Sequence, residues 1–315
     1  MVKPGEAGYA PIMSRLLKNT FSWSKSRDRC LQECPRQYFY RYYGAWGGWD
    51  PGADPAVRER YILKNLQTRH MWAGDKVHQA VEQALLAVRK GMPPPRADGL
   101  VDRTLRAMRQ DFRNSRDGRY RQDPKKTCGL IEHAYEVPVD DAVWKETADR
   151  VAAGIRTFLG SGIFAALRDL PADHWLELET LRTIDIGGVD VYVKLDLAYR
   201  DQADIVIYDW KTGRGGGDEV ALQFAVYALY AMDAWEVNAD QVRAREYNLV
   251  RDEVAEHPVA DDVVAAAHDY ILESIGEMQG LMDDVDANTA SEETFPLTDD
   301  EQACRTCPFR RVCEK

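Results

Sequence analysis

The segment 196–211, DLAYRDQADIVIYDWK, constrains this chain more than any other. Two apolar runs with a period of two flank a short turn, a pattern that predicts adjacent antiparallel strands. Asp196 lies near the end of the first run, and Asp209 and Lys211 end the second. Pairing of the two strands would bring both carboxylates to one edge of a sheet. Because side chains alternate along a strand, Lys211 should share a face with Asp209.

Two carboxylates and an amine at one sheet edge are typical of a metal-dependent site that hydrolyses phosphodiesters. Carboxylates suit Mg²⁺ or Mn²⁺, which prefer hard oxygen ligands. Such an ion can polarise a phosphodiester and activate water, while a lysine stabilises the developing charge. The alternative is that Asp209 and Lys211 form an exposed ion pair before a turn, because D-x-K is a common pattern.

The rest of the chain predicts a single α/β domain with a helical N-terminal part. We expect strands at 175–184, 189–199, 204–211 and 242–250. We expect helices at 21–43, 55–91, 98–116, 141–169, 218–235 and 259–285. Ser22 or Ser24 should cap the first helix, and Gly74 is where the second could break. The segments 44–54, 91–99 and 213–219 should be loops or turns.

Composition limits the partners and the cellular location that this domain can have. The formal charge is −11, which argues against a nucleic-acid partner only if the charge is spread evenly. The acids instead concentrate at 283–293 and 298–301, whereas the first 130 residues are rich in Arg and Lys. The chain contains no run of 18 apolar residues, so we expect no membrane-spanning helix. The N-terminus lacks the apolar core of a secretory signal peptide. We therefore expect a cytoplasmic protein without a membrane partner.

Six cysteines fall at the two ends of the chain, with one in between: Cys30, Cys34, Cys128, Cys304, Cys307 and Cys313. In a cytoplasmic chain, the C-x2-C-x5-C spacing of the last three favours a metal or iron–sulfur site over disulfides. Cys128 has no partner in this pattern, and we expect it not to be a ligand of that site.

Three further residues could complete the site at the sheet edge. His78 lies beside an apolar helical stripe, where a lone histidine is either structural or a ligand that would favour Mn²⁺. Gln223 and Tyr227 are four residues apart and project from one face of the helix at 218–235. They would either cover the site or, for Tyr227, pack in the core.

Taken in order, these residues resemble the PD-(D/E)XK nucleases of the RecB type. The shared elements are G-x3-H ending at His78, Glu179, Asp196, D-x-K-T-G from Asp209 and Q-x3-Y from Gln223. The runs CPRQYFY at 34–40 and CRTCPFRRVC at 304–313 resemble the iron–sulfur subgroup. That subgroup includes the AddB nuclease domain and the CRISPR-associated adaptation exonucleases. The resemblance extends from about residue 21 to residue 313.

The resemblance implies a restriction-endonuclease-like α/β fold, with a mixed central sheet flanked by helices and a C-terminal iron–sulfur knot. It implies a lead-in at 1–20 and one nuclease domain at 21–315, in which 21–170 is mainly helical. The sheet core would occupy 174–250, and 259–315 would carry the last helix and the cysteine cluster.

The resemblance also implies roles for individual residues. Metal ligands would be His78, Asp196, Asp209 and the carbonyl of Trp210, with Lys211 as the catalytic lysine. Gln223 and Tyr227 would position substrate and lysine. Glu179 matches the acid on the preceding strand, although Glu177 is equally placed by the period of two.

Two departures and one choice accompany the resemblance. The family often has a glycine before the first aspartate, where this chain reads Val193, Lys194 and Leu195, and Trp210 is bulky within D-x-K. In the subgroup one N-terminal cysteine and three C-terminal cysteines hold a [4Fe–4S] cluster, here Cys34, Cys304, Cys307 and Cys313. Cys30, one helical turn earlier, competes with Cys34, and zinc could use the same ligands. Either centre would stabilise the fold by on the order of several kcal/mol, because it closes a long loop.

The resemblance therefore implies a metal-dependent DNA exonuclease or endonuclease, with an exonuclease that prefers single-stranded DNA or DNA ends as the leading expectation. Repair, CRISPR adaptation and phage defence are all compatible, with helicase, CRISPR or defence proteins as partners. A catalytically weak nucleic-acid-binding or assembly subunit is the alternative, since the chain is acidic and has no G-x4-G-K-[ST] motif. A third hypothesis is an enzyme that acts on RNA and is stabilised by a zinc ion at the cysteines.

Overall fold

A computed structural model of the chain describes residues 18–213 and 218–315. Most of the expected lead-in at 1–20, and most of the turn at 213–219, lie outside these residues. The helices are α1 (Lys25–Glu33), α2 (Pro35–Phe39), α3 (Pro55–Lys64), α4 (Arg69–Arg89), α5 (Ala97–Arg116), α6 (Ile131–Ala134), α7 (Asp141–Gly160), α8 (Gly162–Arg168), α9 (Asp218–Trp235), α10 (Asp261–Gly280) and α11 (Glu301–Thr306).

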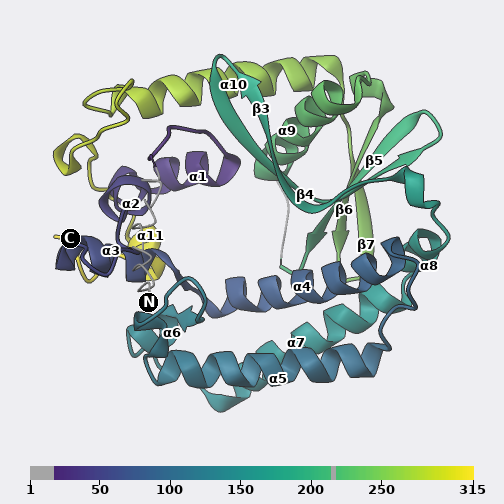
Figure 1. Ribbon diagram of the computed structural model, residues 1–315, viewed down its shortest axis with the longest axis horizontal. Coiled ribbons are helices and arrows are strands. Elements are labelled where there is room, and N and C mark those ends of the chain that lie inside the picture. The colour runs from purple at the N-terminus through teal and green to yellow at the C-terminus, as the bar shows by residue number, and fades with distance from the viewer. Residues whose placement is uncertain (1–17, 214–217) are drawn as a thin grey trace, which may run out of the picture.

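A five-stranded mixed sheet forms the centre of the molecule (Figure 1). Its strands, in spatial order, are β3 (Trp175–Ile186), β4 (Val189–Asp201), β5 (Asp204–Lys211), β6 (Val242–Asn248) and β7 (Glu253–His257). All neighbours are antiparallel except β5 and β6, which are parallel because α9 connects them as a crossover helix. The predicted mixed sheet flanked by helices, with a helical N-terminal region, is confirmed.

Two apolar cores lie on the two faces of this sheet, because successive side chains of β5 alternate between them. Ile207 packs toward α9 and α10, in the core that contains Phe224 and Ile271. Tyr208 packs toward α4 and α7, in the core that contains Ile155. Figure 1 shows α9 and α10 on one side of the sheet and α4, α5 and α7 on the other. The end of β5 is therefore held from both faces.

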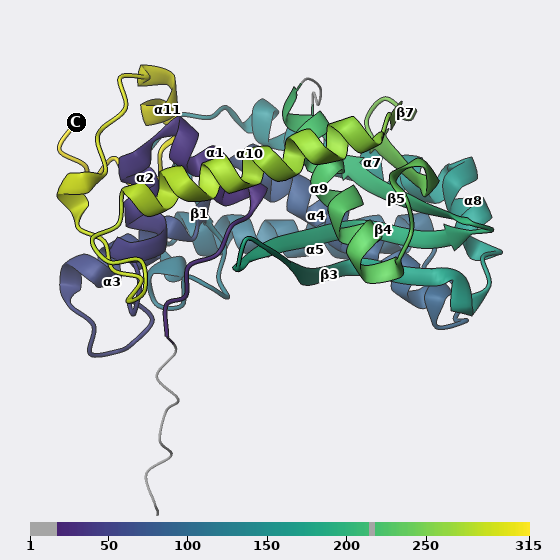
Figure 2. The same cartoon turned by 90° about the horizontal axis from the view of Figure 1, so that it is seen from above.

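The two ends of the described chain lie side by side. Figures 1 and 2 both place α11 beside α2. Arg36 forms an ion pair of 2.9 Å with Glu292, and the Tyr40 hydroxyl donates to the same carboxylate at 2.6 Å. The Tyr40 ring also contacts Phe309, with 5.5 Å between ring centroids. Contacts between buried aromatic rings thus bring the N-terminal cysteines close to the C-terminal ones.

Three local predictions need correction. The predicted break at Gly74 is wrong, because Gly74 lies inside α4; the break comes at 65–68, where β1 (Leu66–Gln67) pairs with β2 (Gly129–Leu130). A glycine at position 74 instead leaves room for a neighbour, because a Cβ there would lie only 3.2 Å from Thr212 Oγ1. The predicted helix at 141–169 divides at Ser161, whose side chain caps α8. Strand β7 was not predicted, since its side chains lack an apolar face.

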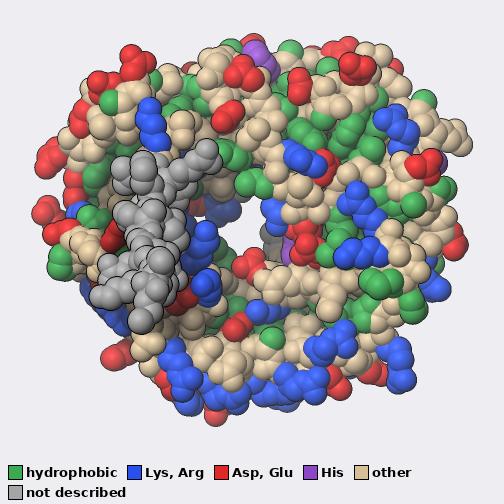
Figure 3. Space-filling view, viewed as in Figure 1, with side chains coloured by type: hydrophobic (Ala, Val, Ile, Leu, Met, Phe, Trp, Pro, Cys, Tyr) green, Lys and Arg blue, Asp and Glu red, His purple; other side chains and the backbone are tan. Residues whose placement is uncertain are grey.

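The space-filling view shows an opening through the middle of the molecule (Figure 3). Lys and Arg side chains stand along parts of its rim, and acidic side chains with a histidine gather on its right side. Among the described helices no single one is long and apolar enough to cross a membrane, although the bent pair α7–α8 passes on length and composition.

Candidate active site

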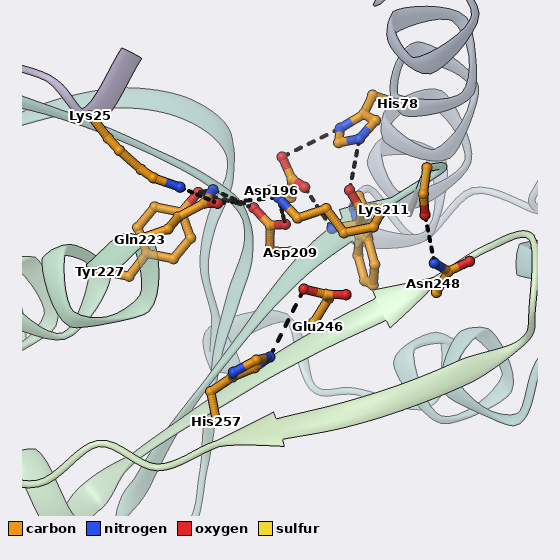
Figure 4. Close-up of polar contacts among 12 residues, drawn as sticks. Lys25, His78, Asp196, Asp209, Lys211, Gln223, Tyr227, Glu246, Asn248 and His257 are labelled. Atoms are coloured by element: carbon orange, nitrogen blue, oxygen red, sulfur yellow. Dashed lines mark hydrogen bonds and ion pairs between the residues drawn. The ribbon is translucent and has the colours of Figure 1, made fainter. Parts of the chain in front are cut away.

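Asp196 and Asp209 meet where β4 pairs with β5. The register places Leu197 opposite Tyr208, so the next positions along the ladder are Asp196 and Asp209. Both aspartates are buried, with 7% and 3% of their surface exposed. Figure 4 shows the two carboxylates close together among side chains from α4, β5 and α9. The structure thus brings together the two acids that the strand–turn–strand pattern predicted at one edge.

The Asp209 carboxylate is held by three side chains. Its Oδ2 lies 2.7 Å from Lys211 Nζ, and its Oδ1 accepts from Gln223 Nε2 at 2.7 Å and from the Tyr227 hydroxyl at 3.1 Å. The oxygen of the Gln223 amide accepts from Lys211 Nζ at 3.1 Å. The Asp209–Lys211 pair is therefore a largely buried contact inside a network and not an isolated surface ion pair.

His78 connects α4 to the acids of β3 and β4. Its Nδ1 lies 3.4 Å from a carboxylate oxygen of both Asp196 and Glu179. Its Nε2 lies 3.0 Å from the Trp210 carbonyl, so this nitrogen must be the donor. The Trp210 amide in turn donates to Asp196 Oδ2 at 2.7 Å. The backbone of Trp210 thus forms hydrogen bonds with both His78 and Asp196, two of the predicted metal ligands.

Glu179, and not Glu177, belongs to this cluster. Glu179 has a φ of +50°, a left-handed conformation that is strained for a residue within a strand. This irregular backbone lies between the regular pairs Leu178–Leu197 and Thr180–Leu195. Glu177 instead pairs with Arg182 at 2.7 Å and accepts from the Tyr230 hydroxyl at 3.0 Å. The period of two could not separate the two glutamates, because the strand is not regular there.

The electrostatics of the cluster show an excess of carboxylate. Burial alone lowers the pKa of His78, but Asp196 and Glu179 outweigh burial and raise it to about 11. Burial raises the pKa of Asp196 against the effect of His78. Burial also acts to raise the pKa of Glu179, yet its contacts with His78 and Lys194 outweigh it and lower that pKa. Burial, and next the Asp209 charge, raise the pKa of Tyr227 well above its usual value.

The residues present fit a divalent cation. Ligand atoms of His78, Glu179 and Asp196 all lie within 4.8 Å of one another. Glu179 Oε1 and Asp209 Oδ2 are buried and accept no hydrogen bond of good geometry from the described residues. Glu179 Oε1 lies 3.4 Å from His78 Nδ1, and Asp209 Oδ2 lies 2.7 Å from Lys211 Nζ. Two carboxylates and an imidazole suit Mn²⁺ or Mg²⁺. Asp209 lies outside the three-residue group, and its oxygens face Lys211, Gln223 and Tyr227 instead.

Several neighbours of the site carried no sequence prediction. Lys194, two residues before Asp196 on β4, forms an ion pair of 2.5 Å with Glu179. Lys25 of α1 donates to Gln223 at 3.5 Å. Glu246 is buried on β6 opposite Asp209 and lies 3.9 Å from His257. The strand sequence VRAREYN gave no signal for Glu246, because an acid between charged and polar residues does not indicate a buried side chain; Figure 4 shows it beside the site.

The cysteines of the two chain ends converge on a second place, at the far side of the N-terminal helices. Cys34, Cys304, Cys307 and Cys313 line one recess with about 440 Å³ of free space, part of it open to solvent. Burial raises the pKa of the Cys307 thiol to about 12. Cys30 is buried but does not line the recess, and Cys128 is not among its lining residues.

Comparison with known families adds one clear finding. The family model described as the PD-(D/E)XK nuclease superfamily matches residues 22–314. No curated protein matches the chain. A solved structure titled "Crystal structure of SSO0001" aligns with 55% of this chain and 78% of that one, at 16% identity and a TM-score of 0.29. The family match covers every residue of the site and all four cysteines that line the recess.

Proposed function

Because the chain belongs to the PD-(D/E)XK nuclease superfamily, we propose that it is a metal-dependent deoxyribonuclease. Its substrate is single-stranded DNA or DNA ends, and it acts as an exonuclease. The superfamily implies a nucleic-acid substrate and a divalent metal. The choice of DNA, of single strands and of exonuclease action follows the resemblance to the iron–sulfur subgroup.

One observation carries the catalytic proposal. A partly buried lysine amine, Lys211 Nζ, lies 2.7 Å from Asp209 and 3.1 Å from Gln223, beside the His78–Glu179–Asp196 group. A scaffold that only binds nucleic acid does not require an ammonium held against a carboxylate next to a set of candidate metal ligands. This arrangement supports a site that hydrolyses a phosphodiester.

The side chains divide the work between holding a cation and orienting the reactants. Mg²⁺ or Mn²⁺ would be held by the group of His78, Glu179 and Asp196. The family resemblance adds Asp209 and the Trp210 carbonyl to this ligand set. The ion would supply Lewis-acid polarisation of the phosphate and a water of lowered pKa. Lys211 would donate to the phosphate oxygens or to the attacking water.

Gln223 and Tyr227 keep this lysine and Asp209 in place. Both side chains contact Asp209 Oδ1, and Gln223 also contacts the lysine amine. They project from the same face of α9, because four residues separate them. Helix α9 is thereby tied to the end of β5, where the reaction would occur.

We also propose that the cysteine recess holds a [4Fe–4S] cluster. Four thiols from both chain ends line one recess, as a four-cysteine cluster requires. A single tetrahedral zinc would draw its thiolates to about 3.8 Å from one another, given a Zn–S distance of about 2.3 Å. Among the described residues, the only group of three or more ligand atoms within 4.8 Å is His78–Glu179–Asp196. The resemblance to the iron–sulfur subgroup is what favours the cluster over zinc, and the metal content of the purified protein decides between them.

The function is tested with anaerobically purified protein. Wild type with Mn²⁺ or Mg²⁺ should degrade single-stranded DNA, and Asp209→Asn or Lys211→Met should lower kcat by at least about 10³-fold. Activity that survives both substitutions would overturn the assignment. Matched RNA and DNA strands decide the sugar preference, and circular single strands separate endonuclease from exonuclease action.

The alternative is an assembly or nucleic-acid-binding subunit built on the nuclease fold. It predicts tight DNA binding without turnover at any Mg²⁺ or Mn²⁺ concentration, with Lys211→Met unchanged in affinity. The same experiment therefore separates the two functions, because it measures binding and cleavage on one set of variants.

A further inference from the structure

A second recess lies on the opposite face of the end of β5 from α9. It is enclosed by α4, α7 and the segment that follows β5, and it contains about 500 Å³ of free space, part of it open to solvent. Arg69, His70, Thr147, Arg150 and Thr212 are the polar side chains among its lining residues. None of the described residues that line it carries a carboxylate, although the chain has a net charge of −11. The recess is therefore locally basic in an acidic protein.

The guanidinium of Arg69 is the central cation of this recess. Its Nη1 donates to the buried Thr147 hydroxyl at 2.6 Å, and its Nη2 lies 3.0 Å from His70 Nε2. Both acceptors are neutral, since burial, and next the charge of Arg69, lower the pKa of His70. Among the described residues, no carboxylate forms an ion pair with the Arg69 side chain. Glu132 accepts only from its backbone nitrogen, at 2.8 Å.

Arg150 supplies the second cation, from the adjacent turn of α7. Its ion pair with Glu146, at 3.3 Å, joins two side chains that are each more than half exposed. Such surface pairs contribute about 0–1 kcal/mol, so the Arg150 guanidinium can leave Glu146 at little cost. The Thr147 hydroxyl donates its proton to the Val143 carbonyl at 2.8 Å, so it orients Arg69 and does not itself donate to a ligand. The recess can therefore present two guanidinium groups and the Thr212 hydroxyl to one anion, a donor set that suits phosphate.

The recess adjoins the catalytic lysine. Thr212 lines it and directly follows Lys211, about 3.8 Å away along the backbone. The two side chains point to opposite faces of the strand end, because side chains alternate. The absence of a side chain at Gly74 leaves room for Thr212, whose Oγ1 would lie 3.2 Å from a Cβ there. A strand bound at Lys211 can thus reach the recess by passing around the end of β5.

We propose that this recess is a phosphate subsite, which binds the backbone phosphate next to the scissile one through Arg69 and Arg150. The proposal rests on the nuclease function proposed above. Phosphate contacts position a strand without reading its sequence. The subsite would therefore set which bond of the strand lies at Lys211, and it would act on KM more than on kcat.

The test uses single-stranded oligonucleotides in which one phosphate at a time, on either side of the cleaved bond, is a neutral methylphosphonate. With wild type, one such position should raise KM about tenfold, the effect of losing a charge-assisted contact. Arg69→Gln and Arg150→Gln should each raise KM for the unmodified strand by a similar factor, and should no longer respond to that position. A structural role for these arginines would not remove the response to one chosen phosphate.

The control is Arg156→Gln, which removes the same charge from α7 at an exposed ion pair with Asp98. It should leave KM and the methylphosphonate profile as in wild type. Arg150 is exposed, so its variant keeps the test valid even if Arg69→Gln is unstable. An unchanged profile in both recess variants would overturn the subsite, while cleavage by wild type would still support the nuclease function.

A binding measurement decides the case if wild type shows no cleavage. Fluorescence anisotropy with a labelled single strand, at several salt concentrations, gives the slope of log K against log [salt]. Loss of one phosphate contact should make that slope shallower by about 0.7. Equal slopes for wild type, Arg69→Gln and Arg150→Gln would overturn the subsite. Shallower slopes without turnover would support it and refute the nuclease function.

Discussion

The side-chain nitrogen of Gln223 lies 2.7 Å from Oδ1 of Asp209. This contact joins α9 to the end of β5, and the amide oxygen of the same glutamine contacts Lys211. One neutral side chain therefore fixes the separation between a carboxylate and an ammonium. Gln223, 12 residues after Lys211 in the chain, is thus part of the geometry of the Asp209–Lys211 pair.

Gln223→Ala should lower kcat about 10- to 100-fold with little change in KM, because Lys211 loses its orientation but the substrate contacts remain. Gln223→Glu should be worse, since a carboxylate would repel Asp209 and hold Lys211 more strongly. Steady-state kinetics on single-stranded DNA, with the melting temperature of each variant, measure this. A change confined to KM would contradict the positioning role.

Glu179→Gln should weaken Mn²⁺ binding and cleavage about 10- to 100-fold, because it removes one carboxylate from the group with His78 and Asp196. Glu177→Gln is the matched control. It should leave Mn²⁺ affinity unchanged but lower the free energy of unfolding by about 1–2 kcal/mol, since Arg182 and Tyr230 lose their partner. Calorimetric titration with Mn²⁺ and urea unfolding separate the two. Equal metal affinities in both variants would argue against Glu179 as a ligand.

Cys34→Ser should lose the iron–sulfur cluster, whereas Cys30→Ser should retain it, because only Cys34 lines the recess with the three C-terminal cysteines. Iron analysis and visible absorbance of anaerobically purified protein measure this, with about four irons per chain expected for wild type. A colourless wild type with one zinc would refute the cluster and leave the nuclease proposal standing. Iron lost from Cys30→Ser alone would assign the ligand to Cys30.

Lys64 should make the stability of the protein depend on pH. Burial, and next the charges of Arg41, Arg27 and Lys125, lower the pKa of Lys64 to about 8. The folded state therefore holds this proton more weakly than the unfolded state, whose lysine has a pKa of about 10.4. The charged lysine destabilises the fold below pH 8, and this cost disappears as the pH rises toward 10.4.

Lys64→Met, which keeps the apolar stem, should raise the free energy of unfolding at pH 7 by on the order of 1–2 kcal/mol, allowing for partial exposure. The gain should shrink at pH 9.5. Urea unfolding of variant and wild type at both pH values measures the difference, so other titrating groups cancel. A gain that is the same at both pH values would show that the lysine charge is not its cause.

Local pattern was enough to predict much of this molecule. Strands β3, β4 and β5 and helix α9 follow from periods of two and of 3.6, because each period reflects which neighbours in sequence face the core. The same periods placed Lys211 on the face of Asp209, and Gln223 on the face of Tyr227. Strand β7 escaped, because an edge strand with exposed side chains has no apolar period.

The sequence by itself thus determined the chemical groups, their order and the strands that carry them. The tertiary structure alone decided which groups lie together. The left-handed backbone of Glu179 turns its side chain toward His78. The packing of α4 against α7 brings Arg69 and Arg150 into one recess with Thr212. The physical reason is range. Periodicity is a property of adjacent residues, whereas these meetings depend on strand register, on one irregular backbone position and on the packing of helices far apart in the chain.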